Sequence, residues 1–275
     1  MPVVEEQDLK NMSPLGSGSS AIVFKATWHN AVVAVKQMKV PMEYAMDTMV
    51  TELGHEIVLW SQLSYPYIVQ FFGVTRKLWL VMDYMEHGTL ADVVTKNEMN
   101  LSEEDVVVLM WQASRGMEYL HARSIIHRDL NPNNIMITGP RTKLVAKLAD
   151  FGLSRVNRNT ADLTRTKSVG TPMYSAPEVL DRSLHSFKSD VFSFGMSLWF
   201  AIKRKHPFLN AHDFFDLRRR LVTEHERPEP VDDPALQKII SWCWDDVPNS
   251  RPTFRQVSAD LEAYLKDHGR GQDEE

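Results

Sequence analysis

The chain has 275 residues, of which 43% are hydrophobic and 24% are charged, and these proportions exclude a disordered protein. Its formal net charge of −5, from 31 basic and 36 acidic residues, argues against general nucleic-acid binding. The single cysteine, Cys243, excludes an intramolecular disulfide and a cysteine-based zinc site. Because it stands between Trp242 and Trp244, we expect a buried structural thiol.

No segment approaches the roughly 20 apolar residues that are needed to cross a bilayer. The first residues are acidic and do not form the basic and then apolar pattern of a secretion signal. We therefore expect a cytoplasmic protein with no membrane insertion by this segment. Residues 1–9 and 268–275 are polar and are expected to be terminal tails.

The N-terminal part of the chain has mostly the pattern of β-strands. Two apolar strands, at residues 22–28 and 31–36, flank His29-Asn30, and this spacing predicts a hairpin with a two-residue turn. Residues 46–63 repeat apolar side chains at helical intervals, and residues 78–82 form another short strand. The pattern predicts a small sheet that carries one helix.

The pattern becomes helical after Gly88. Ser102 and Asp105 have the spacing of a capping box, in which two side chains satisfy free amides at a helix start. Thr253 and Gln256 repeat this signal before the last helix. Further helical patterns cover residues 191–201, 213–223 and 234–242. We expect a single domain at residues 10–267, with a small part at about 10–82, a linker at 83–88 and a large part at about 89–267.

Three motifs in the chain suggest phosphate and metal chemistry. Gly16 and Gly18 lie at the first strand-turn-strand, where backbone amides can approach phosphate oxygens because side chains are absent. Lys36 ends an apolar strand, where a cation costs desolvation unless it meets anions.

The third motif is a polar loop at residues 127–134 between two apolar runs. In it Asp129 and Asn134 stand five positions apart, and Asp150 follows the apolar run at residues 144–149. These three oxygen-bearing side chains can converge on one spot. Oxygen ligands of this kind suit Mg²⁺, which a few protein carboxylates usually hold together with substrate phosphates.

Together these motifs resemble the protein kinase family. His127-Arg128-Asp129 with Asn134 matches the catalytic loop H-R-D-x-x-x-x-N, and Asp150-Phe151-Gly152 matches D-F-G. Val33-Ala34-Val35-Lys36 is similar to the V-A-I-K strand, and the segment from Gly16 to Val23 is similar to the glycine-rich loop, with Ala21 at its third glycine. The resemblance runs from Leu15 to Leu265. It implies an α+β bilobal fold, with a small five-stranded antiparallel sheet lobe carrying one helix and a larger, mainly helical lobe.

The resemblance also implies roles for individual residues in binding ATP. Lys36 would contact the α and β phosphates and pair with Glu56, or alternatively with Glu52. Asp129 would accept the proton of the substrate hydroxyl, and Asn134 and Asp150 would hold Mg²⁺ or Mn²⁺. The remaining nucleotide contacts would come from the strands, the linker and the glycine-rich loop: Leu15, Gly16, Gly18, Val23, Ala34, Met82, Asp83, Met85 and Met136.

Two structural pairings follow from the same resemblance. Asp190, in the segment similar to D-V-Y-S-F-G, would brace the backbone of the catalytic loop. Arg251 would form an ion pair with Glu178. Arg218-Arg219-Arg220 could bind an acidic partner, although three charges on a helix are more often a solvated face.

Residues 170–178 resemble the G-T-x-x-Y-x-A-P-E ending of kinases directed at serine and threonine, and Thr171 would lie beside Asp129. Between this ending and Asp150 lie the hydroxyl residues Thr164, Thr166 and Ser168. We hypothesise that a phosphate on one of them, added by an upstream kinase or by the same kinase in trans, pairs with Arg128 and Arg155. The alternative is a polar loop without regulation.

Asn131 departs from the family pattern, because serine/threonine kinases usually carry a lysine there. The sequence therefore favours a serine/threonine protein kinase of the tyrosine-kinase-like group that acts on protein substrates, and leaves two alternatives. One is a tyrosine or dual-specificity kinase. The other is a catalytically weak or inactive pseudokinase scaffold, although Lys36, Glu56, Asp129, Asn134 and Asp150 are all present.

Overall fold

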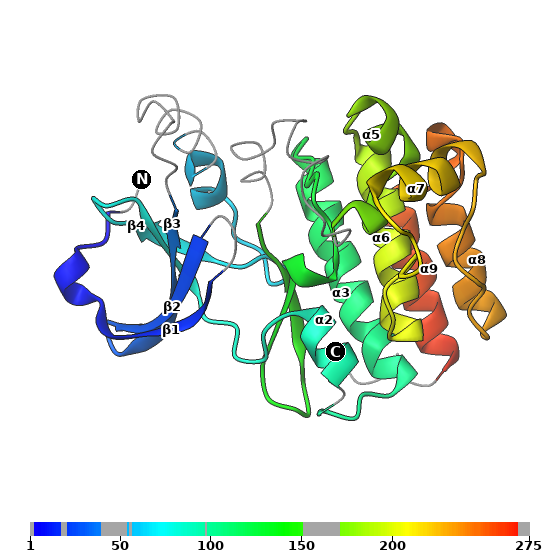
Figure 1. The fold of residues 1–275 in the computed structure, drawn as a ribbon. Coiled ribbons are helices and arrows are strands. Elements are labelled where there is room, and N and C mark those ends of the chain that lie inside the picture. The colour runs from blue at the N-terminus through cyan, green and yellow to red at the C-terminus, as the bar shows by residue number, and fades with distance from the viewer. Residues whose placement is uncertain are drawn as a thin grey trace. The chain divides into compact units, whose positions relative to one another are not determined.

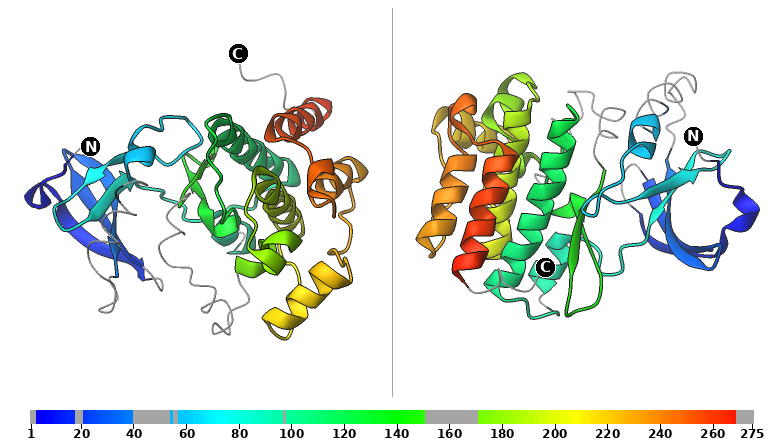
Figure 2. Two further views of the ribbon diagram at one scale, coloured as in Figure 1. Left: turned by 90° about the horizontal axis from the view of Figure 1, so that it is seen from above. Right: turned by 180° about the vertical axis from the view of Figure 1, so that it is seen from behind.

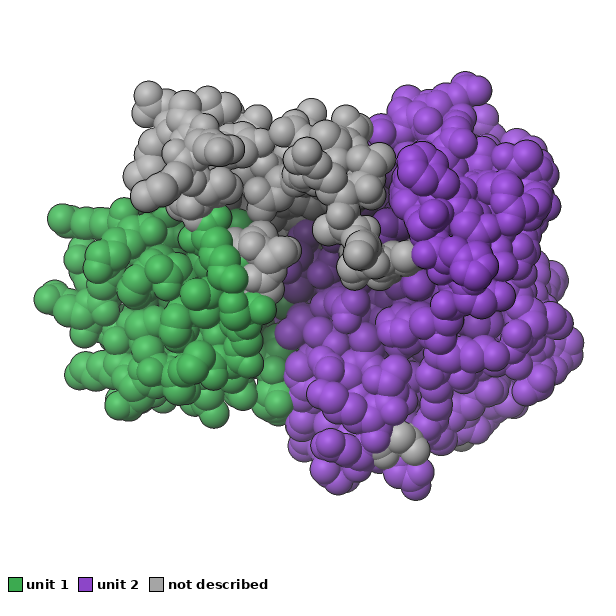
Figure 3. Space-filling model, in the orientation of Figure 1, with its two compact units in different colours: residues 1–86, 155–157 green, residues 87–154, 158–275 purple. Residues whose placement is uncertain are grey.

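The structure is a computed structural model, and it describes residues 3–17, 21–39, 54, 57–96, 98–150 and 171–268. The chain forms two compact units, which Figure 3 shows in different colours. The first unit is residues 1–86 with 155–157, and the second unit is residues 87–154 with 158–275. Each unit has its own secondary structure, and we describe them in turn.

The first unit is built on a five-stranded antiparallel sheet (Figure 1). The strand order is β1-β2-β3-β5-β4, preceded by the short 3-10 helix η1 (Glu6–Asp8). The strands are β1 (Lys10–Ser17), β2 (Ala21–Trp28), β3 (Ala31–Met38), β4 (Phe71–Val74) and β5 (Trp79–Asp83). The expected five-stranded antiparallel sheet is confirmed.

The hairpin between β2 and β3 turns at His29 and Asn30, as the sequence predicted. Their φ angles are 46° and 66°, so both residues are left-handed, as a two-residue type I′ turn requires. The pairing then runs without a shift from Trp28 opposite Ala31 to Ala21 opposite Met38. This unbroken register fixes which side chains of β2 and β3 share a face.

One face of the sheet carries the apolar core of the first unit. Its buried members are Val4, Leu9, Ala26, Val33, Val35 and Val81, and Phe24, Trp28 and Trp79 pack against them. Because successive side chains of a strand point to opposite faces, the residues between these belong to the other face. The core therefore fixes the sheet and leaves the second face for other contacts.

The helix expected at residues 46–63 is described as helical only at residue 54 and at residues 57–61. Ile57 and Trp60 are buried there, and the indole nitrogen of Trp60 donates to the carbonyl oxygen of Val69 at 2.9 Å. Glu52 and Glu56, the two candidate partners of Lys36, lie outside the described residues.

The second unit is mainly helical, with one two-stranded hairpin of β6 (Ile135–Thr138) and β7 (Val145–Leu148). Its longer helices α3, α6, α8 and α9 run side by side (Figure 2). The α-helices are α2 (Leu90–Lys96), α3 (Glu103–Ala122), α5 (Pro177–Arg182), α6 (Phe187–Lys203), α7 (Phe214–Arg218), α8 (Pro234–Cys243) and α9 (Phe254–Asp267). The short turns are η2 (Pro132–Asn134), η4 (Thr171–Tyr174), the π-helical η5 (Arg219–Thr223) and η6 (Pro248–Ser250). In the part of the chain that is described, no helix is both long and apolar enough to span a bilayer.

Both predicted capping boxes are present. At the start of α3, the amide of Ser102 donates to the carboxylate of Asp105 at 2.9 Å, and the amide of Asp105 donates back to the Ser102 hydroxyl at 3.1 Å. Thr253 and Gln256 form the same reciprocal pair before α9. The helix starts could be predicted because a cap is a local interaction between residues three positions apart.

Helix α6 is the buried centre of the second unit. It is apolar on nearly all sides, and its members Phe192, Phe194 and Phe200 have no exposed surface. Its Gly195 lies against α8, where an added Cβ would come within 2.6 Å of the Cβ of Cys243. Cys243 has no exposed surface, which confirms the expected buried thiol, and this burial raises the pKa of the thiol.

The predicted helix at residues 213–223 is observed as α7 followed by the π-helical turn η5. The guanidinium of Arg218 contacts Asp181, while those of Arg219 and Arg220 lie 2.7 and 3.5 Å from Asp216. All three arginines therefore form ion pairs with carboxylates of the same chain. Of the two alternatives for Arg218-Arg219-Arg220, this arrangement favours a solvated helix face over a binding site for an acidic partner.

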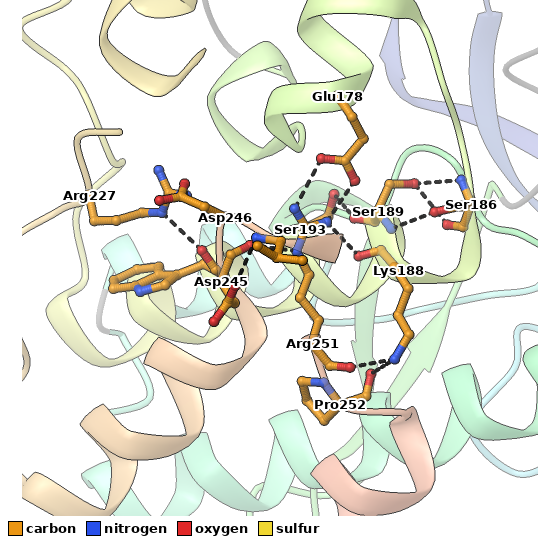
Figure 4. Close-up of polar contacts among 12 residues, drawn as sticks. Glu178, Ser186, Lys188, Ser189, Ser193, Arg227, Asp245, Asp246, Arg251 and Pro252 are labelled. Carbon is orange, nitrogen blue, oxygen red and sulfur yellow. Dashed lines mark hydrogen bonds and ion pairs between the residues drawn. The ribbon is translucent and has the colours of Figure 1, made fainter. Parts of the chain in front are cut away.

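The predicted pair of Arg251 and Glu178 is also present, and it is bidentate (Figure 4). The two guanidinium nitrogens of Arg251 lie 2.7 and 3.0 Å from the two Glu178 oxygens. Arg251 is 1% exposed and also donates to the carbonyl oxygens of Asp245 and Lys188 at 2.8 and 3.0 Å. The pair ties the start of α5 to the segment that precedes α9.

Removing one member of this pair should be costly, because the other charge stays in a largely buried place. We expect Arg251→Met to lower the free energy of unfolding by about 3–5 kcal/mol, measured by urea denaturation. The double variant Arg251→Met with Glu178→Gln should lose less than the sum of the two single variants. Lys266→Ala, which removes the exposed pair of Lys266 and Glu262, is the control and should change stability little. Additive losses would contradict a coupled pair.

Candidate active site

The loop at residues 127–134 is held by one buried carboxylate, that of Asp190 near the start of α6. Its two oxygens accept the backbone amides of His127 and Arg128 at 2.8 and 2.9 Å. The ring nitrogen Nε2 of His121, at the end of α3, lies 2.9 Å from the same carboxylate. The predicted bracing of this loop by Asp190 is therefore confirmed, and His121 is a partner that the sequence analysis missed.

This bracing holds the loop in an unusual backbone conformation. Arg128 has a φ angle of 69°, in the left-handed region that a residue with a long side chain seldom adopts. Such a conformation costs on the order of 1–3 kcal/mol and persists only when its surroundings fix it. The two hydrogen bonds from backbone N–H groups to the Asp190 carboxylate fix His127 and Arg128, the two residues that precede Asp129.

Two asparagines surround Asp129. The amide nitrogen Nδ2 of Asn134 lies 2.7 Å from the backbone oxygen of Asp129 and 3.2 Å from its Oδ2. The Nδ2 of Asn131 lies 2.9 Å from the same backbone oxygen and 3.3 Å from Oδ1. The carboxylate of Asp129 therefore receives one N–H donor on each oxygen, which fixes its orientation.

The β6–β7 hairpin brings Asn134 and Asp150 to the same end. Asn134 directly precedes β6, Asp150 follows β7 by two residues, and Ile135 pairs with Leu148. The amide of Ala149 donates to the backbone oxygen of Asn134 at 2.9 Å, so the pairing continues beyond the strands. Asp150 has a φ angle of 55°, a second left-handed residue in the same place.

This end of the hairpin offers oxygen donors suited to a hard cation. The carbonyl of Asp129 is an acceptor, so it must face the Nδ2 atom of Asn134, which leaves Oδ1 as the atom that can face a cation. The carboxylate of Asp150 is the second donor. One amide oxygen and one carboxylate are a partial shell that substrate phosphates and water would complete for Mg²⁺.

In the first unit, the expected nucleotide-binding residues share one face of the sheet. Val23 pairs with Lys36, and Ala34 pairs with Met82. Ala34 and Lys36 are two positions apart on β3, so all four side chains lie on the face opposite the apolar core. Gly16 pairs with Val23 and begins the approach to the glycine-rich turn.

The same face carries Leu80 together with the cations Lys25 and Lys36, and this mixture of apolar and cationic side chains suits a flat ring with attached phosphates. Leu15 is exposed on β1, close in sequence to this turn. Gly18 lies outside the described residues. Met136, the remaining expected contact, belongs to β6 of the second unit.

The segment after β5 offers backbone groups of the kind that bind an adenine edge. The amide of Asp83 donates to the backbone oxygen of Gln70 at 3.0 Å, and the Asp83 carboxylate accepts from the amide of Gln70 at 3.1 Å. The backbone of Gln70 thus fixes both the amide and the carboxylate of Asp83. Within the described residues, the amide of Met85 makes no backbone hydrogen bond.

Tyr174 is a further anchor that the sequence analysis did not find. It lies in η4, is 2% exposed, and its hydroxyl lies 2.8 Å from Nδ1 of His206. Burial raises the pKa of Tyr174 and lowers the pKa of His206, so burial disfavours the charged form of both groups, and the tautomer of the ring decides which of them donates. The contact fixes the segment that resembles the G-T-x-x-Y-x-A-P-E ending. In the sequence, the only sign of this contact is that Tyr174 occupies the tyrosine position of that motif.

Comparison with known proteins identifies the class to which this fold and site belong. The model of the protein kinase domain matches residues 9–261, and the chain therefore belongs to the protein kinase family. Members of this family use ATP and a divalent metal ion. The donor set at the end of the β6–β7 hairpin fits such an ion.

The chain is similar to several named kinases. A probable serine/threonine-protein kinase of Dictyostelium discoideum is 35% identical over 267 residues, which are 94% of this chain and 18% of that protein. The probable serine/threonine-protein kinase drkC of the same organism is 32% identical over 90% of this chain and 34% of its own length. The serine/threonine/tyrosine-protein kinase HT1 of Arabidopsis thaliana is 32% identical over 90% of this chain and 64% of its own length. The chain thus spans from about a fifth to just under two thirds of these relatives.

Burial of His127 should make the free energy of unfolding depend on pH. It has no exposed surface, and burial lowers its pKa below the ordinary value of 6.5. As the pH falls, the unfolded chain therefore binds this proton before the folded chain does, and the free energy of unfolding decreases below about pH 6.5. One such proton contributes a slope of up to about 1.4 kcal/mol per pH unit.

The variant His127→Phe removes this proton and should flatten the slope between about pH 7 and pH 5. Urea unfolding at several pH values measures it for both proteins. An equal slope in the variant would show that His127 is not the linked group.

Proposed function

We propose that this domain transfers the γ-phosphate of ATP to serine and threonine hydroxyls of protein substrates. One observation carries the proposal: hydrogen bonds join Asn134 to Asp129 in one loop, and the β6–β7 pairing brings Asp150 to the same hairpin end as Asn134. Phosphoryl transfer needs positioned charges more than covalent chemistry, and this is what such a rigid arrangement supplies. The similarity to serine/threonine kinases supports the choice of hydroxyl.

In this proposal Asp129 receives the proton of the substrate hydroxyl and orients its oxygen for attack. The N–H donors from Asn131 and Asn134 hold the carboxylate in place. Asn134 Oδ1 and Asp150 would hold Mg²⁺, or alternatively Mn²⁺, and a bound ion neutralises the charge of the transferred phosphate. Lys36 contacts the α and β phosphates, with Glu56 as its partner.

The adenine ring would bind at the face of the sheet that carries Val23, Ala34 and Met82. Met136 of β6 is a further expected contact of the nucleotide. The backbone of Asp83 and Met85 would provide its hydrogen bonds. The catalytic domain would run from about residue 10 to 267, with residues 83–88 as its linker. The family match to residues 9–261 supports this extent.

We also place the domain in the tyrosine-kinase-like group, because its Gly-Thr-Pro ending stands together with tyrosine-kinase-like motifs such as Asp190-Val191-Phe192. The similarity to HT1, whose name includes serine, threonine and tyrosine, supports a second candidate, a dual-specificity kinase. A scaffold without activity is the third. The protein substrate and the upstream kinase, or a second copy acting in trans, are the expected partners.

A transfer assay distinguishes these candidates. With radiolabelled ATP, Mg²⁺ and a generic protein substrate, the wild type should incorporate phosphate on serine and threonine, whereas Asp129→Asn should be at least about 100-fold slower. Nucleotide binding, followed with a fluorescent ATP analogue, should persist in the variant because Asp129 acts on the hydroxyl. Incorporation no higher than in the variant would favour the scaffold, and phosphotyrosine in the product would favour the dual-specificity kinase.

Regulation of this activity is proposed to involve a phosphate on Thr164, Thr166 or Ser168, which lie outside the described residues. Arg128 supports the proposal: its Nε atom is buried and has no hydrogen-bond partner within the described residues, although such a group normally has one. A phosphate would supply acceptors for this guanidinium and for Arg155.

Replacing all three hydroxyl residues with alanine should lower the rate of transfer, because the pairing phosphate can no longer form. Treatment of the wild type with a phosphatase should lower its rate to that of the variant, and should leave the variant unchanged. Full activity of the triple variant would reject this mode of regulation.

A further inference from the structure

Asn131 is almost fully buried, with 3% of its surface exposed, and it touches the candidate catalytic base directly. Its side chain has two separate contacts. The oxygen Oδ1 accepts the backbone amide of Asn133 at 3.0 Å and so caps the short helix η2. The nitrogen Nδ2 lies 2.9 Å from the backbone oxygen of Asp129 and 3.3 Å from its Oδ1.

These contacts fix the orientation of the Asn131 amide. The backbone N–H of Asn133 can only donate, so it must face the oxygen of Asn131. The backbone oxygen of Asp129 can only accept, so it must face the nitrogen. Both contacts therefore require the same orientation of the Asn131 amide. In this orientation its N–H group faces Asp129.

Asn131 and Asn134 act on opposite oxygens of the same carboxylate. Asn131 donates to Oδ1 of Asp129 and Asn134 donates to Oδ2, while both donate to its backbone oxygen. Rotation of the carboxylate would break both side-chain bonds at once. A carboxylate oxygen can accept more than one hydrogen bond, so a bond from an asparagine does not by itself prevent Asp129 from accepting the proton of a substrate hydroxyl.

We propose that Asn131 is a positioning residue that fixes the orientation of the Asp129 carboxylate through Nδ2, an inference that rests on the proposed kinase activity. The residue acts through Asp129 and does not itself contact the transferred group. A reacting oxygen must be held near its attack geometry, and small misplacements of a catalytic group lower turnover without changing nucleotide affinity.

The two roles of Asn131 can be separated by substitution. Asp and Ser are as good as Asn at capping a helix start, so Asn131→Asp and Asn131→Ser keep an acceptor for the amide of Asn133. Both remove the N–H donor. Asn131→Asp in addition places a second carboxylate beside Asp129, where like charges repel.

The test measures kcat and KM for ATP, and the thermal unfolding midpoint, of the whole chain with a generic protein substrate. We expect kcat to fall about 10-fold in Asn131→Ser and about 100-fold in Asn131→Asp, with KM for ATP close to the wild type in both variants and the midpoint close to the wild type in Asn131→Ser. Asn133→Ala is the matched control, because the Asn133 side chain is exposed in the same loop. Its kcat should equal that of the wild type.

The outcomes separate this inference from the proposed function. A wild type that transfers no phosphate rejects the proposed function, and no variant is needed to see it. An active wild type with full kcat in Asn131→Ser and Asn131→Asp overturns the positioning role, because capping alone then suffices. A fall in kcat that is matched by an equal loss of ATP affinity, or by a collapse of the unfolding midpoint, also overturns it and makes Asn131 a structural residue.

Discussion

The whole catalytic loop depends on the contact between the Asp190 carboxylate and the backbone amides of His127 and Arg128. A buried carboxylate is costly unless donors surround it, and here two amides and the ring of His121 do so. Asp190 belongs to α6, the buried central helix of the second unit. Its hydrogen bonds therefore attach the loop to the packed core of that unit. This support allows Arg128 to keep a left-handed backbone immediately before Asp129.

The remaining site groups are positioned by backbone pairing in the same way. In the second unit, the β6–β7 register and the amide of Ala149 bring Asn134 and Asp150 to one end of a hairpin. In the first unit, the registers of β2, β3 and β5 collect Val23, Ala34, Lys36 and Met82 on the sheet face opposite the apolar core. In both units, hydrogen bonds between strands decide which side chains meet, and the side chains add the chemistry.

Asn131 shows how a departure from a family pattern can be accommodated. Where serine/threonine kinases usually carry a cation, this chain has a buried amide that satisfies the amide of Asn133 and the carbonyl of Asp129. The residue at this position therefore carries no charge and instead makes hydrogen bonds to both of these backbone groups.

Sequence alone determined what local interactions control. The caps at Ser102 and Thr253 and the turn at His29-Asn30 involve residues at most three positions apart, and the catalytic motifs are recognisable by their spacing. Resemblance to the family also predicted two contacts between residues far apart in the sequence, that of Asp190 with the catalytic loop and that of Arg251 with Glu178. Only the tertiary structure decided that Asn131 is buried against Asp129, that His121 joins Asp190, and that Tyr174 meets His206. Those contacts depend on where the side chains point and which helices pack together, and the spacing of residues in a sequence does not contain that information.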